Sequence, residues 1–168
     1  NALKRIADVN PDIYAIVFCR TKIETQEVAD KLSHSGYNAD ALHGDLSQAQ
    51  RDYVMNRFRR KQLQLLIATD VAARGLDVTE LTHVIHYNLP DDPEVYIHRS
   101  GRTGRAGKTG ESVSILHSKE LQRIRHLEKL IGRSIEKAMV PTGKEICQRQ
   151  LLNLIDKVKE IEIDEKKI

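Results

Sequence analysis

The stretch from His98 to Gly107 places three arginines and a histidine among glycines. Arginine carries a permanent charge on a planar fork that fits phosphate oxygens, and glycine lets a ligand or another backbone come close. If residues 93–105 are helical, His98, Arg102 and Arg105 fall on one face, where like charges repel unless an anion or another protein surface lies opposite. The stretch therefore predicts a binding site for a highly charged phosphate group.

Two other interpretations of this stretch compete with phosphate binding. A basic cluster can simply keep a solvated helix face soluble, but each glycine would cost such a helix roughly 0.5–1 kcal/mol relative to alanine. The glycines at 101, 104, 107 and 110 imitate the collagen triplet, yet so few triplets without proline cannot form a triple helix. Phosphate binding explains the arginines and the glycines together.

A second segment, Ala68–Asp77, follows an apolar run and contains a hydroxyl, two carboxylates, an arginine and a glycine. Amides and a hydroxyl at a strand end can hold a phosphodiester, and a carboxylate can accept hydrogen bonds from ribose hydroxyls. An ordinary connecting loop, in which Asp70 caps a short helix that Gly75 ends, explains these residues equally well. Both interpretations stay open on the sequence alone.

Two further polar segments follow apolar runs. His43–Arg51 puts a glycine turn before a helix start, where amide donors and the helix dipole attract phosphate. Gln48 and Arg51 could straddle a nucleic-acid backbone, although a capped helix with a solvated arginine is as good an explanation. Arg20, Thr21 and Lys22 form a polar strand end of the same kind.

Several other kinds of site find no support. Gly107-Lys108-Thr109 resembles the end of a P-loop, but Arg102 stands where that loop needs a glycine, and Gly143-Lys144 is followed by Glu145 instead of a hydroxyl. No pair of adjacent carboxylates follows an apolar strand, the histidines show no metal-ligand spacing, and no nucleophilic triad stands out. We therefore expect no metal site, and a nucleotide cradle only on another domain.

A fold must hold these segments in place. The sequence contains short β-branched runs, which are typical of strands, and they alternate with amphipathic stretches, which are typical of helices. The alternation predicts a doubly wound α/β fold, with a mainly parallel sheet flanked by helices and ligands bound beyond the carboxyl ends of the strands. Capping boxes at Thr21–Glu24, Ser47–Gln50 and Thr142–Glu145 mark helix starts. The predicted strands are 13–19, 38–42, 63–68, 82–87 and 111–116, and the predicted helices begin after Thr21, Ser47, Asp92 and Lys119.

After Gly132 the pattern changes to a single amphipathic helix with a charged end. We expect a domain over residues 1–138 and a helical, charged carboxyl-terminal extension over residues 139–168, which either packs on the domain or meets a partner. The chain has 168 residues, and because it opens at Asn1 as if in the middle of a helix, we expect a piece of a longer protein.

The composition limits the class of protein. The net charge of +3 permits nucleic-acid binding without requiring it, although the arginines gather locally. No apolar run approaches the roughly 18 residues of a membrane span, and no signal peptide opens the chain. Cys19 and Cys147 lie far apart, which fits a reducing, cytoplasmic location and no membrane partner.

Taken in order, these segments resemble the second RecA-like domain of DEAD-box ATP-dependent RNA helicases, a P-loop NTPase-related domain that lacks the P-loop. The resemblance covers roughly residues 1–135. Ile16–Thr21 resembles the family's motif IV, Gln48–Arg51 its Gln-x-x-Arg element, Ala68–Asp77 its motif V, and His98–Arg105 its motif VI.

The resemblance implies a role for each matching residue. Arg102 and Arg105 would act as arginine fingers on the γ-phosphate of ATP, which is held with Mg²⁺ mainly by an absent amino-terminal domain. Asp77 and Gly75 would contact the nucleotide, with Asp77 on the ribose. The RNA backbone would lie on Arg20, Thr21, Gly44, Gln48, Arg51 and Thr69, while His98, Arg99 and Arg74 would link motifs across the two domains.

The implied function is the carboxyl-terminal half of an RNA-dependent ATPase and helicase that pries short RNA duplexes apart without sequence preference, and whose isolated piece is inactive. One alternative is a non-catalytic RNA-binding clamp or partner platform of helicase-like fold. Others are a related helicase that translocates on DNA and a flavodoxin-like nucleotide switch, which would need a phosphate loop that the first strand lacks.

Overall fold

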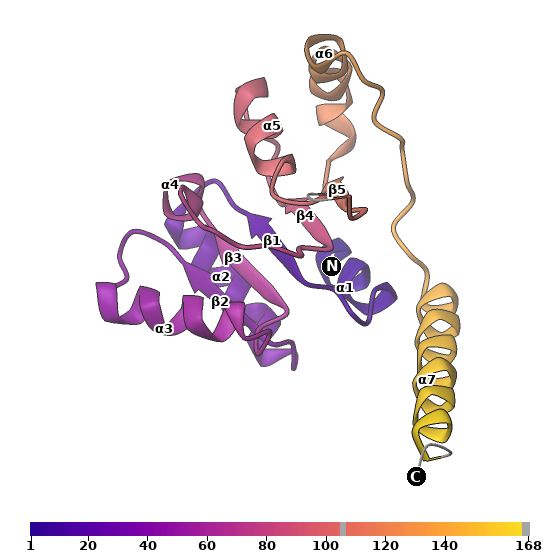
Figure 1. The fold of residues 1–168 in the computed structure, drawn as a ribbon. Coiled ribbons are helices and arrows are strands. Elements are labelled where there is room, and N and C mark those ends of the chain that lie inside the picture. Colours follow the sequence, from indigo (N-terminus) through magenta and orange to yellow (C-terminus); the bar gives the residue numbers. More distant parts are fainter. Residues whose placement is uncertain (105–106, 166–168) are drawn as a thin grey trace. The chain divides into compact units, whose positions relative to one another are not determined.

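The computed structural model describes residues 1–104 and 107–165, with side chains through Ile161 (Figure 1). Two compact units divide the chain. The larger runs from Ile13 to Glu136, and the smaller joins Asn1–Asp12 to the residues from Lys137 onward.

The larger unit is built on one parallel sheet of five strands in the order β2-β3-β1-β4-β5. The predicted doubly wound parallel sheet is therefore confirmed. Three of the strands, β1, β3 and β4, are wholly buried, as expected for strands covered on both faces; their side chains are apolar except for two histidines of β4. The strands are β1 (Ala15–Phe18), β2 (Ala39–Leu42), β3 (Leu65–Ala68), β4 (His83–His86) and β5 (Glu111–Ser114).

Helices connect the strands, and their starts follow the predicted caps. Ser47 and Gln50 form a complete capping box at α3, and the Asp92 side chain caps α5 just before Pro93. Figure 1 shows α2 and α3 on opposite faces of the sheet. The connecting helices are α2 (Lys22–His34), α3 (Gln48–Arg59), α4 (Asp70–Ala73) and α5 (Pro93–Ser100), and a 3₁₀ turn (Ser118–Glu120) leads into α6 (Leu121–Ile131).

The core under α3 holds the sheet together on that face. Phe58 is fully buried, its ring centroid lies 4.5 Å from that of Tyr14, and the Tyr14 hydroxyl donates a hydrogen bond to the Phe58 carbonyl. Ile16 and Phe18 of β1 belong to the same cluster, because alternate residues of a strand point to one face. Burial of each such large side chain stabilises the fold by about 1.5–3 kcal/mol, so this cluster fixes where the strand ends lie.

The structure corrects three local expectations. The helix predicted over residues 93–105 ends at Ser100, where the N–H groups of Arg102 and Thr103 donate to carbonyls three residues back and replace the α-helical pattern; Gly104, with φ +67°, lies beyond this end. Glu24 does not complete a capping box with Thr21, because its carboxylate accepts a hydrogen bond from Asn88 instead. The short helix α4 exists, but the Thr69 hydroxyl caps it rather than Asp70.

The strand β5 differs from the others in composition. Glu111 and Ser112 are exposed, and Val113 and Ser114 are only partly covered. This strand forms one edge of the sheet, next to β4. The apolar strands thus occupy the middle of the sheet, and a polar strand closes this side.

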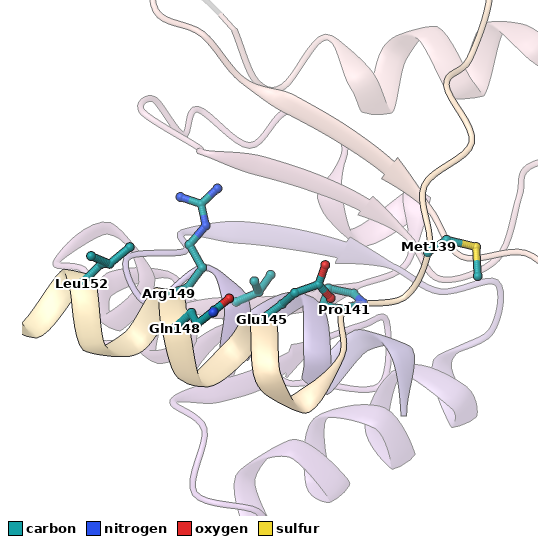
Figure 2. A pocket seen from close by; sticks show the side chains of 7 residues that line it. Met139, Pro141, Glu145, Gln148, Arg149 and Leu152 are labelled. Carbon is teal, nitrogen blue, oxygen red and sulfur yellow. The ribbon is translucent and has the colours of Figure 1, made fainter.

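The smaller unit packs α1 (Ala2–Val9) against α7 (Gly143–Glu165). Thr142 and Glu145 make the predicted capping contacts at the start of α7, and Asn153 donates a hydrogen bond of 2.9 Å to the Asp12 carboxylate. A hollow of about 320 Å³ in this unit is lined by Val9, Met139, Pro141, Glu145, Gln148, Arg149 and Leu152. Figure 2 shows the side chains that line it. The carboxyl-terminal helix predicted from the sequence is therefore present.

Two findings bear on the predicted chemical environment. Within residues 1–104 and 107–165, no helix combines the length and the apolar character that crossing a bilayer requires. Cys19 and Cys147 are both unpaired, the first buried and the second exposed. Burial raises the pKa of the Cys19 thiol to about 12, so this thiol stays protonated and unreactive.

Candidate functional site

One row of predicted site residues lies along the carboxyl edge of the sheet. Arg20 and Thr21 follow β1, Gly44 follows β2 and Thr69 follows β3, and these three strands are neighbours. Adjacent strands lie about 4.8 Å apart, so the loops span roughly 10 Å. Gln48 opens α3 at the same edge, because a helix that follows a parallel strand begins where that strand ends.

Several residues of this row are held by hydrogen bonds. Arg51 donates to the Ala72 carbonyl of α4 at 3.2 Å, and the backbone N–H of Arg20 donates to the Asn88 side chain at 2.8 Å. Gly44 is exposed, with open space where a side chain would begin, so another backbone can approach it. The structure thus brings together all six residues predicted for RNA, and their role remains a prediction.

A second group of predicted residues surrounds a small hollow of about 100 Å³. Donor groups dominate its lining, since Arg74, His98, Arg99 and Arg102 all contribute to it. Phe18, Ala73 and Val95 add apolar walls, and Asp70 contributes a carboxylate. Donors that converge on one hollow favour an anion, because guanidinium and imidazole N–H groups bind oxyanions well.

Arg99 is the fixed member of this group. Its side chain is only 4% exposed, and Nε and Nη2 donate to the two oxygens of Asp70, each at 2.6 Å. Nη1 donates to the Asn88 carbonyl at 2.9 Å, and the guanidinium lies 5.0 Å from the centre of the Phe18 ring. The observed contacts tie motif VI to the segment after β3 within one unit, while its predicted link across two domains remains a prediction.

Arg102 is held less tightly than Arg99. Nη1 donates to the Leu76 carbonyl at 2.7 Å, and the residue is partly exposed at the hollow. No ion pair of Arg102 occurs within the described part of the chain. Its other donors thus leave room for the predicted contact with a phosphate. Arg105, the second predicted finger, lies outside the described residues.

The segment 74–77 presents the residues predicted to contact a nucleotide. Gly75 has φ +74°, a conformation that favours glycine, and it turns the chain after α4. Asp77 is exposed two residues later, next to the Leu76 carbonyl that binds Arg102. The structure therefore brings the predicted nucleotide contact and the predicted finger to one segment, and both roles remain predictions.

Sequence reasoning missed Asn88, which connects three parts of the site. Its side-chain oxygen accepts from the Arg20 backbone N–H, its amide nitrogen donates to Glu24, and its carbonyl accepts from Arg99. A polar residue so soon after an apolar strand at the carboxyl edge was the available signal. The partners lie far away in sequence, so no spacing rule could name them.

His86, at the end of β4, was also missed. The imidazole is fully buried, and its ring centroid lies 4.6 Å from that of Tyr96 in a stacked arrangement. Its Nδ1 accepts a hydrogen bond from Arg99 Nη1. Since arginine only donates, Nε2 carries the proton and meets the Ser112 hydroxyl at 3.1 Å. Burial, with the nearby Arg99 charge, lowers the pKa of His86 to about 3, so the ring stays neutral.

Comparison with known proteins gives a consistent set of similarities. The family described as "Helicase conserved C-terminal domain" matches residues 1–107. The chain is 44% identical over 156 residues to the DEAD-box ATP-dependent RNA helicase CshA of Geobacillus kaustophilus. The matched region covers 93% of this chain and 33% of that protein. The chain thus spans about a third of the length of the curated relatives it matches.

Solved structures show the same similarity. A DEAD box protein from the hyperthermophile Methanococcus jannaschii is 47% identical with a TM-score of 0.76, over 82% of this chain and 38% of that one. Dbp5 of S. cerevisiae, in a structure bound to RNA and ADP BeF3, is 32% identical with a TM-score of 0.77, over 92% of this chain and 41% of that one.

Replacement of Asp70 by asparagine should destabilise the larger unit. The change leaves the buried Arg99 guanidinium without its counter-charge, which typically costs about 3–5 kcal/mol, and we expect the lower end because the Asn88 carbonyl still accepts. Urea unfolding followed by circular dichroism measures this. Asp45→Asn, which removes an exposed ion pair with Lys22, is the control and should change stability little. Equal, small effects of both variants would contradict the buried ion pair.

The stability of the chain should depend on pH through His86. The unfolded imidazole takes up a proton below about pH 6.5, whereas the native ring resists protonation down to about pH 3. Stability is therefore fully present above pH 6.5 and falls by about 1.4 kcal/mol per pH unit below it, in the window down to about pH 3. Unfolding titrations of His86→Gln should show a smaller slope, with a remainder from His83, whose pKa burial also lowers, and His126→Gln, at an exposed site on α6, should retain the full slope. An unchanged slope in His86→Gln would assign the effect to other groups.

Proposed function

Because the chain belongs to the helicase conserved C-terminal domain family, as the second RecA-like domain of a DEAD-box protein, we propose that it is the carboxyl-terminal half of an ATP-dependent RNA helicase. The full-length protein would couple ATP hydrolysis to local unwinding of RNA duplexes. The observation that carries this proposal is the position of Arg102, partly exposed at a donor-lined hollow and bound only to a backbone carbonyl in the described contacts.

The row along the carboxyl edge is proposed to hold the RNA backbone. Backbone amides, hydroxyls and arginines at strand ends suit phosphate and sugar oxygens, which carry little base information. Binding should therefore be largely independent of sequence and sensitive to salt. A relative of known structure, Dbp5, is described as bound to RNA, which supports the assignment of RNA as the polymer.

ATP is proposed to lie between this domain and an amino-terminal RecA-like domain. Arg102 and Arg105 would neutralise charge that develops on the γ-phosphate, and Asp77 with Gly75 would meet the nucleotide from the same side. Among the described residues no cluster of histidines, cysteines and carboxylates could hold a metal ion, so the other domain would hold the Mg²⁺ that accompanies ATP. His98 and Arg74 would link the two domains.

The domain boundaries and the location belong to the same proposal. We place the RecA-like domain at residues 1–138 and the helical extension at 139–168; the change of compact unit near Lys137 supports the boundary between them, whereas residues 1–12 pack with the extension in the smaller unit. A cytoplasmic location is supported by the two unpaired cysteines and by the bacterial relatives.

The isolated chain should not hydrolyse ATP. It lacks the P-loop that cradles nucleotide phosphates, so residues 1–168 alone should show no RNA-stimulated phosphate release, and the covalently joined amino-terminal domain should restore it. Parallel reactions with RNA and with DNA of the same sequence identify the polymer. Hydrolysis by the isolated chain would overturn this division of labour, and equal stimulation by DNA would remove RNA as the specific activator.

Arg102→Ala in the full-length protein should lower kcat strongly and RNA affinity little. Arginine fingers contribute about 10³–10⁵-fold to phosphoryl transfer, so we expect a loss of about 10³-fold in kcat with RNA affinity within about twofold. Single-turnover hydrolysis and fluorescence anisotropy measure the two quantities. Arg133→Ala, at an exposed arginine beyond α6, is the charge-matched control. An unchanged kcat in Arg102→Ala would favour a non-catalytic RNA clamp.

A further inference from the structure

Two loops of the larger unit are joined by three contacts, of which the roles above use only that between Arg102 and the Leu76 carbonyl. One loop, the nucleotide loop, runs from Leu76 to Leu81 and carries Asp77. The other, the finger loop, contributes Arg102, Thr103 and Lys108 among the described residues. Three hydrogen bonds connect the described residues of the two loops. We call this set of three contacts the loop clasp.

Thr103 lies at the centre of the loop clasp. Its hydroxyl donates to the Leu81 carbonyl at 2.5 Å, so the backbone directly after Arg102 is bound to the end of the other loop. The neighbouring Gly110 packs against this hydroxyl so closely that a Cβ there would lie 2.0 Å from Thr103 Oγ1. A glycine is thus needed at 110 because the Thr103 side chain packs directly against its backbone. This packing restricts rotation of the Thr103 side chain.

The other two contacts flank Thr103. Arg102 itself donates to the Leu76 carbonyl at 2.7 Å, one residue before Asp77. Lys108 binds Glu80 at 2.8 Å, and Glu80 also binds Lys61 at 2.8 Å. These lysines and Glu80 are roughly half exposed, so salt screens their ion pairs, and the Thr103 hydrogen bond is the less screened contact.

Glu80 adopts a backbone conformation that supports a fixed geometry. Its φ is +67°, which is unusual for a residue with a side chain, and such conformations persist only where surrounding contacts hold them. Lys61, its partner from the end of α3, has φ +57°. The loop that carries Asp77 is therefore fixed at its far end as well as at Leu76.

We propose that Thr103 is a positioning residue that fixes the finger loop on the nucleotide loop, so that Arg102 and Asp77 reach one nucleotide in a set geometry. This inference rests on the proposed function, because it presumes that both loops meet ATP. Misplacement of a catalytic group by about 1 Å can reduce a rate severely although the group is still present. The Thr103 hydroxyl acts through Arg102 and does not touch the substrate.

The experiment compares Thr103→Val with Thr103→Ser in the full-length protein. Valine keeps the branched shape and removes the donor, and serine keeps the donor. We expect Thr103→Val to lower kcat for RNA-stimulated ATP hydrolysis about tenfold, the effect of one neutral hydrogen bond, with the KM for ATP and the RNA affinity within about twofold. Thr103→Ser should restore most of the rate.

Controls separate this inference from stability and from the proposed function. Thr109→Val, at an exposed threonine outside the loop clasp, should leave kcat unchanged. A wild-type rate in Thr103→Val, or an equal loss in Thr103→Ser, would overturn the positioning role. Should Thr103→Val fail to fold, Thr103→Ala decides because it removes the same donor: a kcat lowered about tenfold supports the inference, and an unchanged kcat overturns it. Absence of RNA-stimulated hydrolysis in the wild-type protein would instead refute the proposed function.

Discussion

The ion pair between Arg99 and Asp70 is the interaction on which the site depends. A guanidinium that is 96% buried is tolerated only with a counter-charge and with its donors satisfied, and Asp70 and the Asn88 carbonyl supply both. The bidentate contact also fixes direction, because a planar fork accepts a carboxylate in few orientations. The segment after β3 is thereby tied to α5, although 29 residues separate the two side chains in the sequence.

This ion pair gives the four-residue helix α4 a defined place. Arg51 binds its Ala72 carbonyl from the side of the predicted RNA row, and Arg99 binds Asp70 from the side of the hollow. Thr69 caps the same helix, so one short element borders both groups of predicted residues. A helix this short has little stability of its own, and its geometry therefore follows from the residues that hold it.

Much of this arrangement could be predicted from the sequence, because local physical rules decide it. Apolar runs fix the strands, side-chain caps at Ser47 and Asp92 fix two helix starts, and a parallel sheet must gather the residues that follow its strands at one edge. The row from Arg20 to Thr69 was therefore predictable as a group. The end of α5 was not, since the glycine at 101 that follows its last residue can continue a helix at modest cost or end it.

The contacts that orient the site could not be predicted, because they join residues distant in sequence. Neither the carbonyl that Thr103 meets nor the three partners of Asn88 follow from any periodicity. His86 lies in an apolar strand, where a histidine looks like an ordinary core residue, and only the assembled sheet places it under Arg99. Sequence patterns thus predict which residues gather, and tertiary packing decides how each one points.

The polar composition of β5 affects how readily another strand can add to this edge of the sheet. An outermost strand offers unpaired amides and carbonyls to any other strand, and a charged side chain there makes the addition of a neighbour unfavourable. Glu111 and Ser112 occupy that position, so a foreign sheet could extend this one only by dehydrating a carboxylate. The charge on β5 therefore lowers the tendency of this edge to aggregate by strand addition.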